Sequence, residues 1–296
     1  MRRVVFLAAA LASTAAIGWA QPASRRYRPA VALPSFQDVA IDEASGMAAS
    51  RRNPGVVWVH NDSGARPLVY AVDRRGRTAA VYRLGGARAR DWEDMAYGPG
   101  PNGRGSFLYV GDIGDNGRRR TDCAVYRLPE PKIGASSTNV PAVRRAFRYP
   151  DGPHNAEALL VHPKTGVVYI VTKEESGVAG VYKFPPEKPG EAAPVTLTRV
   201  GTVRIAGESH FFPNLVTGGD ISPDGRRVAL CTYAAAYELT LPAGARDFDA
   251  IWKTRPAAVV LPFLPQCEAI CYTPDGKSLL VTSEQAPAPF YRLDAR

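Results

Sequence analysis

Acidic residues recur along this sequence at intervals that would bring them together in a repeating fold. A glutamate or an aspartate lies at or near the start of five short segments, each of which includes or leads into an apolar run. The candidate metal ligands among them are Glu43, Glu93, Glu157, Asp220 and Glu268. Crowded carboxylates repel one another unless a cation or shared protons offset their charge. Oxygen ligands in this number suit Ca²⁺, or Mg²⁺ that retains water.

A second set of polar residues follows apolar runs that are typical of strands. The stretch GDIGDN at 111–116 comes directly after FLYV at 107–110. We assign Asp112, the aspartate nearest the run, to the metal ligands, and the later Asp115 and Asn116 to the turn or to a ligand. The candidate ligand-binding residues are Asn61, Asp62, Asp115, Asn116, Lys173, Tyr233 and Glu284.

An ordinary turn is the alternative for each of these residues taken singly. Aspartate and asparagine are common after strands, and NDSG at 61–64 alone predicts a turn. The recurrence of an acid at the same point of several repeats favours a shared site, because an unpaired buried glutamate costs free energy.

A repeat of about 55 residues organises the whole chain. A small or apolar residue, a tyrosine, any residue and an apolar residue recur in that order five times. The five tyrosines are Tyr70, Tyr126, Tyr182, Tyr237 and Tyr291, at spacings of 56, 56, 55 and 54 residues. Such a period indicates one structural unit per repeat.

Each period predicts four antiparallel strands, and radial repetition of such units is a β-propeller. A turn containing glycine follows the acidic segment, then an apolar run, the tyrosine strand and a fourth strand such as TAAVYRL at 78–84. No stretch sustains a helical period. We predict an all-β, five-bladed propeller. Its expected blades are 43–86, 92–150, 156–206, 216–264, and 267–296 combined with 28–36.

Ring closure by the N-terminal segment completes this prediction. The fifth period lacks a fourth strand because the chain ends soon after Tyr291, and residues 28–36 can supply it. A β-sandwich is the alternative for many short strands, but it does not explain the period. In a propeller, the start of the first strand and the end of the second lie on one face, the top face. The candidate residues are therefore expected around one mouth of the axis.

Residues 1–20 are typical of a secretory signal peptide. Arg2 and Arg3 precede an uncharged run, and Gly18 and Ala20 are small residues before a cut after Ala20. We expect a mature single domain of residues 21–296 that is periplasmic or secreted. The run is short for a membrane span, and no later stretch is long enough. The formal charge is +9, but the basic residues are scattered, which argues against a nucleic-acid partner. We expect a monomer.

Four cysteines lie beyond the signal peptide, and export permits disulfides. They are Cys123, Cys231, Cys267 and Cys271. A Cys231–Cys267 bridge is favoured because both residues should lie near the top of adjacent blades. Buried free thiols are the alternative.

The sequence contains none of the common catalytic motifs. It has no GxSxG, HExxH or Walker loop, and no GxGxxG after a strand. The catalytic candidates are His60, as a base toward a metal-bound water, and Lys173, which would neutralise developing charge.

Several motifs taken together resemble a known group of proteins. They are EASGM at 43–47, HNDSG at 60–64, DWEDMAYGPG at 91–100, LYVGDIGDN at 108–116 and NAEALLVHPKTG at 155–166. The set resembles exported bacterial β-propeller proteins labelled WD40-like, NHL-like or phytase/esterase-like. The resemblance implies a propeller with a polar central face and carries no established reaction.

Two functions are consistent with these observations. The first is a binding or scaffold protein that holds Ca²⁺ on the top face and engages a small molecule or a partner protein. The second is a Ca²⁺-dependent hydrolase of a phosphoester or a lactone that uses the same face.

Overall fold

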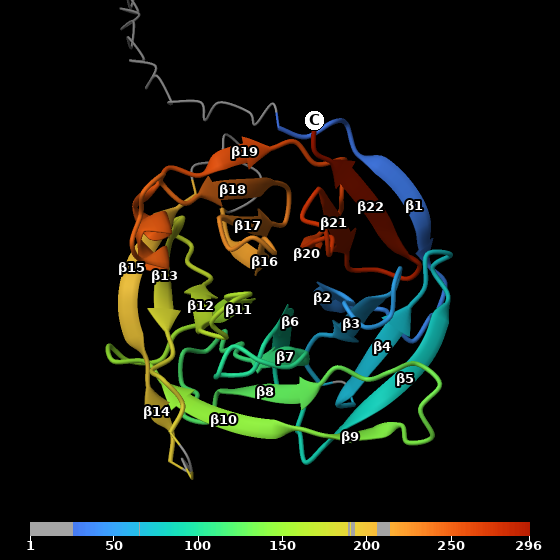
Figure 1. The fold of residues 1–296 in the computed structure, drawn as a ribbon, viewed down its shortest axis with the longest axis horizontal. Helices are drawn as coiled ribbons and strands as arrows, with labels where there is room; N and C mark the ends of the chain where they lie inside the picture. The colour runs from blue at the N-terminus through green and yellow to red at the C-terminus, as the bar shows by residue number, and fades with distance from the viewer. Residues whose placement is uncertain (1–25, 65, 189, 191–192, 206–213) are drawn as a thin grey trace, which may run out of the picture.

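Five sheets surround a central axis in the computed structural model, which describes residues 26–64, 66–188, 190, 193–205 and 214–296 (Figure 1). The predicted all-β, five-bladed propeller is confirmed. The predicted signal peptide lies outside the described residues. Within the described ranges, no helix has the length and apolarity needed to cross a membrane.

Blades 1 and 2 each run outward from an innermost strand through three antiparallel neighbours. The strands of blade 1 are β2 (Ala44–Ala49), β3 (Val57–Asn61), β4 (Leu68–Val72) and β5 (Thr78–Gly85). The strands of blade 2 are β6 (Trp92–Gly98), β7 (Phe107–Asp112), β8 (Ala124–Pro129) and β10 (Val143–Arg148).

Blades 3 and 4 repeat this order, and blade 4 carries the one helical element of the described chain. The strands of blade 3 are β11 (Ala156–Val161), β12 (Val168–Thr172), β13 (Val178–Lys183) and β15 (Thr198–Arg204). The strands of blade 4 are β16 (Val216–Ile221), β17 (Arg227–Thr232), β18 (Ala236–Thr240) and β19 (Ala257–Val259). A 3₁₀ helix, η1 (Phe248–Lys253), lies between β18 and β19 and packs against β15 of blade 3.

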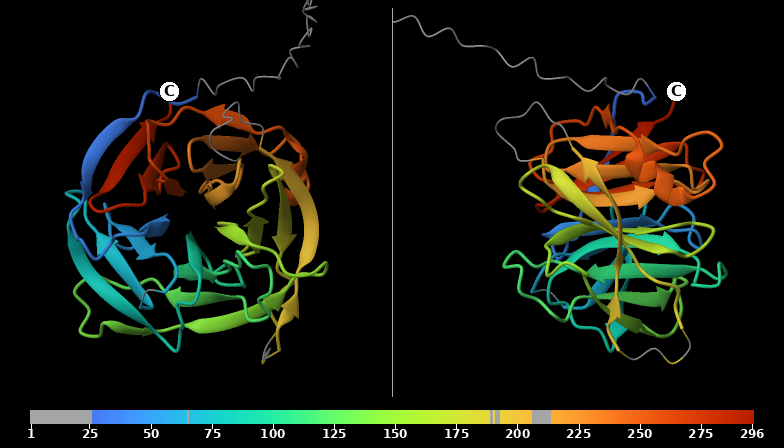
Figure 2. Two further views of the ribbon diagram at one scale, coloured as in Figure 1. Left: turned by 180° about the vertical axis from the view of Figure 1, so that it is seen from behind. Right: turned by 90° about the vertical axis from the view of Figure 1, so that its left-hand side faces the viewer.

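Blade 5 is closed by the N-terminal strand, as predicted. Its strands are β20 (Cys267–Tyr272), β21 (Ser278–Ser283), β22 (Ala288–Asp294) and β1 (Val31–Phe36). Strand β1 pairs antiparallel with β22, and Phe36 packs on Phe290 with ring centroids 5.0 Å apart. The two ends of the described chain therefore meet in one sheet (Figures 1 and 2).

Two short strands add to the outer edges of neighbouring blades. Strand β9 (Asn139–Pro141), from the β8–β10 connection, pairs parallel with β5 of blade 1. Strand β14 (Val195–Thr196), from the β13–β15 connection, pairs parallel with β10 of blade 2. Both cover edges that would otherwise expose unpaired backbone groups.

Large side chains fill the space between blades. At the boundary of blades 1 and 2, fully buried Trp58 meets Tyr82 edge-on, with ring centroids 5.8 Å apart. Buried Trp92 and Met95 belong to the same cluster from the side of blade 2. Burial of each such side chain contributes about 1.5–3 kcal/mol, and this packing fixes the innermost strands around the axis.

Asp94 of β6 forms hydrogen bonds across the axis, beneath the first residues of the innermost strands. Its Oδ2 accepts hydrogen bonds from the backbone N–H of Leu159 at 2.9 Å and of Gly219 at 3.1 Å. Its Oδ1 accepts from the N–H of Met95 at 2.8 Å. Since Gly219 belongs to blade 4, which is not a neighbour of blade 2, that bond crosses the axis. By strand register, the equivalent residues of the other blades are small: Gly46, Ala158, Gly218 and Ala269.

The four cysteines are buried free thiols, so the predicted Cys231–Cys267 disulfide is absent. The two residues lie in adjacent blades, as expected: Cys231 is near the end of β17 in blade 4, and Cys267 is the first residue of β20 in blade 5. Both pack in one apolar cluster between blades 4 and 5, where they serve as small hydrophobic side chains.

Candidate metal and ligand site at the axial mouth

Each innermost strand carries a β-bulge at the same position. In every blade, the register to the second strand shifts after the first residue of the innermost strand, which leaves one residue unpaired. The five unpaired residues, here called the inner ring, are Ser45, Glu93, Glu157, Thr217 and Glu268. Bulges redirect side chains next to functional sites, and these direct three glutamates to one mouth of the axis.

The residues that follow the second strands form an outer ring above the inner ring. Each blade places the residue after its second strand near the residue before its first strand, as in the Asp62 N–H bond to Glu43 O at 2.9 Å. The outer ring consists of Asp62, Gly114, Lys173, Tyr233 and Glu284. In blade 2, Ile113 turns into the core and Gly114 takes the ring position. The two rings together are called the mouth.

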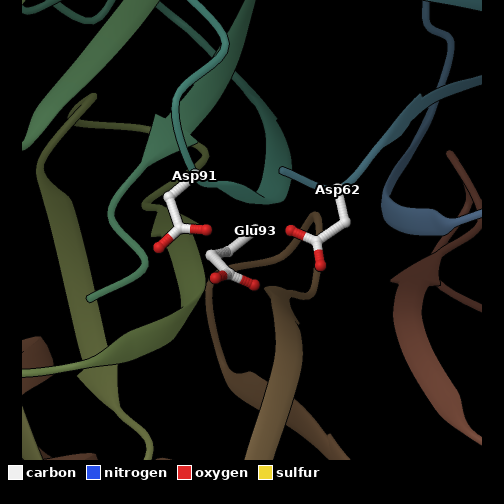
Figure 3. A group of neighbouring side chains, drawn as sticks. All are labelled: Asp62, Asp91 and Glu93. Carbon is white, nitrogen blue, oxygen red and sulfur yellow. The ribbon is translucent and has the colours of Figure 1, made fainter. Parts of the chain in front are cut away.

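Asp62, Asp91 and Glu93 form the tightest group of acids in the mouth. One carboxylate oxygen of each lies within 4.8 Å of the others, and Figure 3 shows the three side chains turned toward one another. Glu93 is buried, and Asp62 and Asp91 are partly exposed. Within the described chain, the carboxylates of Asp91 and Glu93 accept no hydrogen bond. Three carboxylate oxygens at this separation can coordinate one hard cation.

The GDIGDN loop packs directly on two of these acids. A Cβ atom built on Gly114 would lie 2.0 Å from Glu93 Oε1 and 2.6 Å from Asp91 Oδ2. Arg120 holds the loop in place by donating to Gly114 O at 2.6 Å and to Asp112 Oδ1 at 2.6 Å. The absence of a side chain at position 114 thus permits the close approach of loop and carboxylates.

Lys173 carries the positive charge of the mouth on the opposite side. Its Nζ donates to Glu157 Oε1 at 2.5 Å and to the Tyr233 hydroxyl at 2.5 Å. The ammonium also lies 4.8 Å from the centroid of the Tyr233 ring. Burial opposes the charge of Lys173, but Glu157 and Tyr233 outweigh that effect and raise its pKa. Lys173 is therefore a fixed ammonium.

Gln266 joins two further acids in blade 5. Its Nε2 donates to Glu268 Oε1 at 3.0 Å and to Glu284 Oε2 at 2.5 Å. Glu268 is 4% exposed, whereas Glu284 is half-buried. One amide thus supports an inner-ring and an outer-ring carboxyl group.

The acids of the mouth hold protons more tightly than free carboxyl groups do. Burial, followed by the charges of Glu157 and Glu284, raises the pKa of Glu268 to about 9. Burial raises the pKa of Glu157 to about 7 against the lowering effect of Lys173. Burial raises the pKa of Asp62 to about 6. Burial, then the charges of Glu157 and Asp62, raises the pKa of Glu93 well above its usual value. A bound cation would offset this repulsion.

Several predicted site residues lie close to the mouth but have structural partners. Asp112 forms a buried ion pair with Arg120, and it also accepts from the N–H of Asp91 at 3.2 Å. Asp115 accepts from the N–H of Arg120 at 2.7 Å, and Asn116 accepts from Asn155 Nδ2 at 3.0 Å. These contacts shape the GDIGDN loop.

His60 and Asn61 are turned away from the mouth. His60 is fully buried and lies edge-on to Trp92 at 5.4 Å, and burial lowers its pKa. A general base that activates water must be accessible to that water, and the fully buried His60 is not. Asn61 donates to Ala40 O at 2.7 Å and to Asp42 Oδ1 at 2.9 Å, so it fixes the chain that leads into blade 1.

The register corrects two further predictions. Glu43 was aligned with Glu93, but the inner-ring residue of blade 1 is Ser45, and exposed Glu43 is the equivalent of Asp91. Asp220 lies three residues beyond the bulge and accepts from the N–H of Tyr272 at 2.8 Å. It is therefore on the far side of Asp94 from the mouth.

Asp91, Gln266 and Arg120 are the participants that were absent from the predicted site. Asp91 and Gln266 each occupy the position just before the innermost strand. Their shared position depends on the register of the bulges, and the first strand residues that follow it, such as Ala44 and Trp92, share no property that marks it in the sequence. Arg120 carries no recognisable signal in the sequence.

Comparisons with known proteins support no family assignment. No protein-family model matches the chain, and no curated protein matches it. Among solved structures, a gluconolactonase from Xanthomonas campestris has 13% identity and a TM-score of 0.47, and the match covers 92% of this chain and 100% of that one. The Dos1 propeller has 9% identity and a TM-score of 0.40, with 85% and 68% covered. Likeness at this level says nothing about activity, and the resemblance to exported WD40-like proteins stays a prediction.

Proposed function

We propose that the protein binds a divalent cation, Ca²⁺ first of all, in the mouth at Asp62, Asp91 and Glu93. The observation that carries the proposal is the separation of their oxygens, all within 4.8 Å, with Glu93 buried at the inner ring. Carboxylates that are crowded and removed from water are unfavourable without a counter-charge. Their hard oxygen atoms suit Ca²⁺, which accepts several such ligands in variable geometry.

We further propose that the cation holds a small, neutral, hydroxyl-rich ligand. When all four are ionised around the cation, Asp62, Asp91, Glu93 and Glu157 carry four negative charges, against the three positive charges of one divalent cation and Lys173. An anionic ligand would add to this excess and be repelled. Hydroxyl groups, in contrast, can donate to carboxylates at the rim, such as Glu284, and accept from Lys173.

A hydrolase is the second candidate, and the Lys173–Glu157–Tyr233 group favours it. A divalent cation in such a site polarises a carbonyl oxygen and acidifies water. Lys173 would neutralise developing negative charge. Glu157, whose pKa of about 7 is near neutrality, would hold or accept a proton. Because the excess negative charge of the mouth would repel an anionic phosphoester, a neutral lactone is the favoured substrate class of such an enzyme.

Cation binding is tested by calorimetric titration of the chain with CaCl₂, and by thermal melting in EDTA and after Ca²⁺ is restored. We expect saturable binding and a higher Tm with Ca²⁺. Glu93→Gln and Asp91→Asn should each weaken binding, whereas Asp275→Asn, in the exposed β20–β21 turn at the other end of the strands from the mouth, serves as the control. No binding by the wild-type chain would refute the proposal. Ca²⁺-dependent turnover of neutral lactones would favour the hydrolase over a purely binding role.

A further inference from the structure

We propose that Glu157 is a fourth ligand of the cation site, and that it is shared between the cation and Lys173. This inference rests on the cation site proposed above. It extends the site from blades 1 and 2 to blade 3, and it links the cation to the Lys173–Tyr233 pair.

The two oxygens of Glu157 have different surroundings. Oε1 accepts from Lys173 Nζ, whereas Oε2 is buried and has no hydrogen-bond partner in the part of the chain that is described. Glu157 as a whole is 3% exposed. A buried carboxylate oxygen without a partner costs free energy that a ligand can recover, so this atom is a candidate ligand of a cation.

Glu157 lies close enough to the three clustered acids for its charge to interact with theirs. The charges of Asp62 and Asp91 both act on Glu157. The charge of Glu157 acts on Glu93 more strongly than that of any other residue. Glu157 and Glu93 are also equivalent inner-ring residues of adjacent blades. A cation among Asp62, Asp91 and Glu93 is therefore within the field of Glu157, and Oε2 is the atom available to it.

Sharing one carboxylate makes the lysine and the cation competitors. Lys173 withdraws charge from Glu157 through a short hydrogen bond. Removing the ammonium would leave the whole charge of Glu157 to the cation, and binding would tighten. If Lys173 weakened binding only by long-range repulsion of the cation, removing its ammonium would raise the Ca²⁺ affinity by the same factor in a variant without the Glu157 carboxylate.

Calorimetric titration with CaCl₂ of four full-length chains tests this: wild type, E157Q, K173M and the double variant. We expect E157Q to weaken binding at least about tenfold, against little change in the control D275N, whose carboxylate lies in the exposed β20–β21 turn away from the mouth. K173M should tighten binding. In the E157Q background, K173M should change the affinity by less than about twofold, because the two effects share one atom pair.

Three outcomes would overturn the inference or its premise, and they are distinguishable. If the wild-type chain binds no Ca²⁺, the proposed cation site is refuted. If the wild type binds and E157Q and D275N bind with equal affinities, Glu157 is not a ligand. If K173M raises the Ca²⁺ affinity equally in the wild type and in the E157Q variant, Glu157 is not shared between Lys173 and the cation. If E157Q does not fold, as judged by circular dichroism, E157D, which withdraws the carboxylate by one methylene, should weaken binding about tenfold, and unchanged binding would count against Glu157.

Discussion

Gly114 lies against the carboxylate of Glu93, so closely that a Cβ at this position would stand 2.0 Å from Oε1. The neighbours of that Cβ are the ends of the Glu93 and Asp91 side chains and not backbone. A substitution here can therefore be accommodated by moving the two carboxylates. The glycine sets the position of two proposed ligands more than it sets the fold.

Gly114→Ala is expected to weaken Ca²⁺ binding at least about tenfold while it lowers the free energy of unfolding by less than about 1 kcal/mol. Calorimetry and urea unfolding measure the two effects. Gly117→Ala in the same loop is the control, because its Cβ would meet nothing closer than 3.9 Å. A large loss of stability without a change in affinity would contradict this prediction.

The cation-free protein is expected to lose stability as the pH rises. The pKa of Glu268 is about 9 and that of Glu157 about 7, both above the value of 4.5 for an ordinary glutamate. The folded protein thus keeps protons that the unfolded chain has lost. Stability should fall between about pH 4.5 and about pH 9, by up to about 1.4 kcal/mol per pH unit for each titrating group.

Urea unfolding in EDTA at pH 5, 7 and 9 measures this slope. Glu268→Gln should flatten it, because glutamine is neutral throughout the range. Ca²⁺ should restore stability at pH 9 by offsetting the carboxylate charges. Stability that increases from pH 5 to pH 9 in EDTA would be the opposite of what the raised pKa values require.

Asp94→Ala is expected to destabilise the fold by about 3 kcal/mol or more, because it leaves the buried N–H groups of Leu159 and Gly219 without acceptors. Chemical denaturation measures the loss. Asp73→Ala, at an exposed turn in blade 1, is the control; its ion pair with Arg77 is exposed and contributes little. Similar losses of unfolding free energy in the two variants would show that Asp94 stabilises the fold no more than an exposed aspartate does.

Phe36→Ala is expected to cost about 3–5 kcal/mol, because Phe36 is fully buried against Phe290 where the ring closes. Thermal or urea unfolding checks this value. Val39, three residues further on, is 80% exposed, and Val39→Ala should have no measurable effect. Equal stability of both variants would mean that the closing strand contributes little.

The blade count and the closure were predictable because each blade repeats one tyrosine strand at nearly constant spacing. The exact ring positions were not, since the sequence does not show where each bulge falls. Glu43 and Glu93 appear equivalent in the sequence, because each is a glutamate near the start of a repeat. The strand register instead makes Glu43 the equivalent of Asp91.

The partners of Asp112 and Asp220 could not be read from the sequence either. Asp112 meets Arg120 only because the GDIGDN loop folds back on itself. Asp220 binds the N–H of Tyr272 in the next blade, a contact that depends on how two sheets pack. Such neighbours are set by tertiary geometry, which a one-dimensional pattern does not contain.

The bond from Asp94 across the axis has a consequence for the order of events in the mouth. Because the Asp94 hydrogen bonds cross the axis below the inner ring, we expect the mouth to open to solvent on one side only, so that the component bound last must leave first. A ligand held over the cation would trap it, and a cation could not enter beneath a ligand already seated. Loading would be ordered, cation before ligand, and exchange of the cation would be slow whenever the ligand is present.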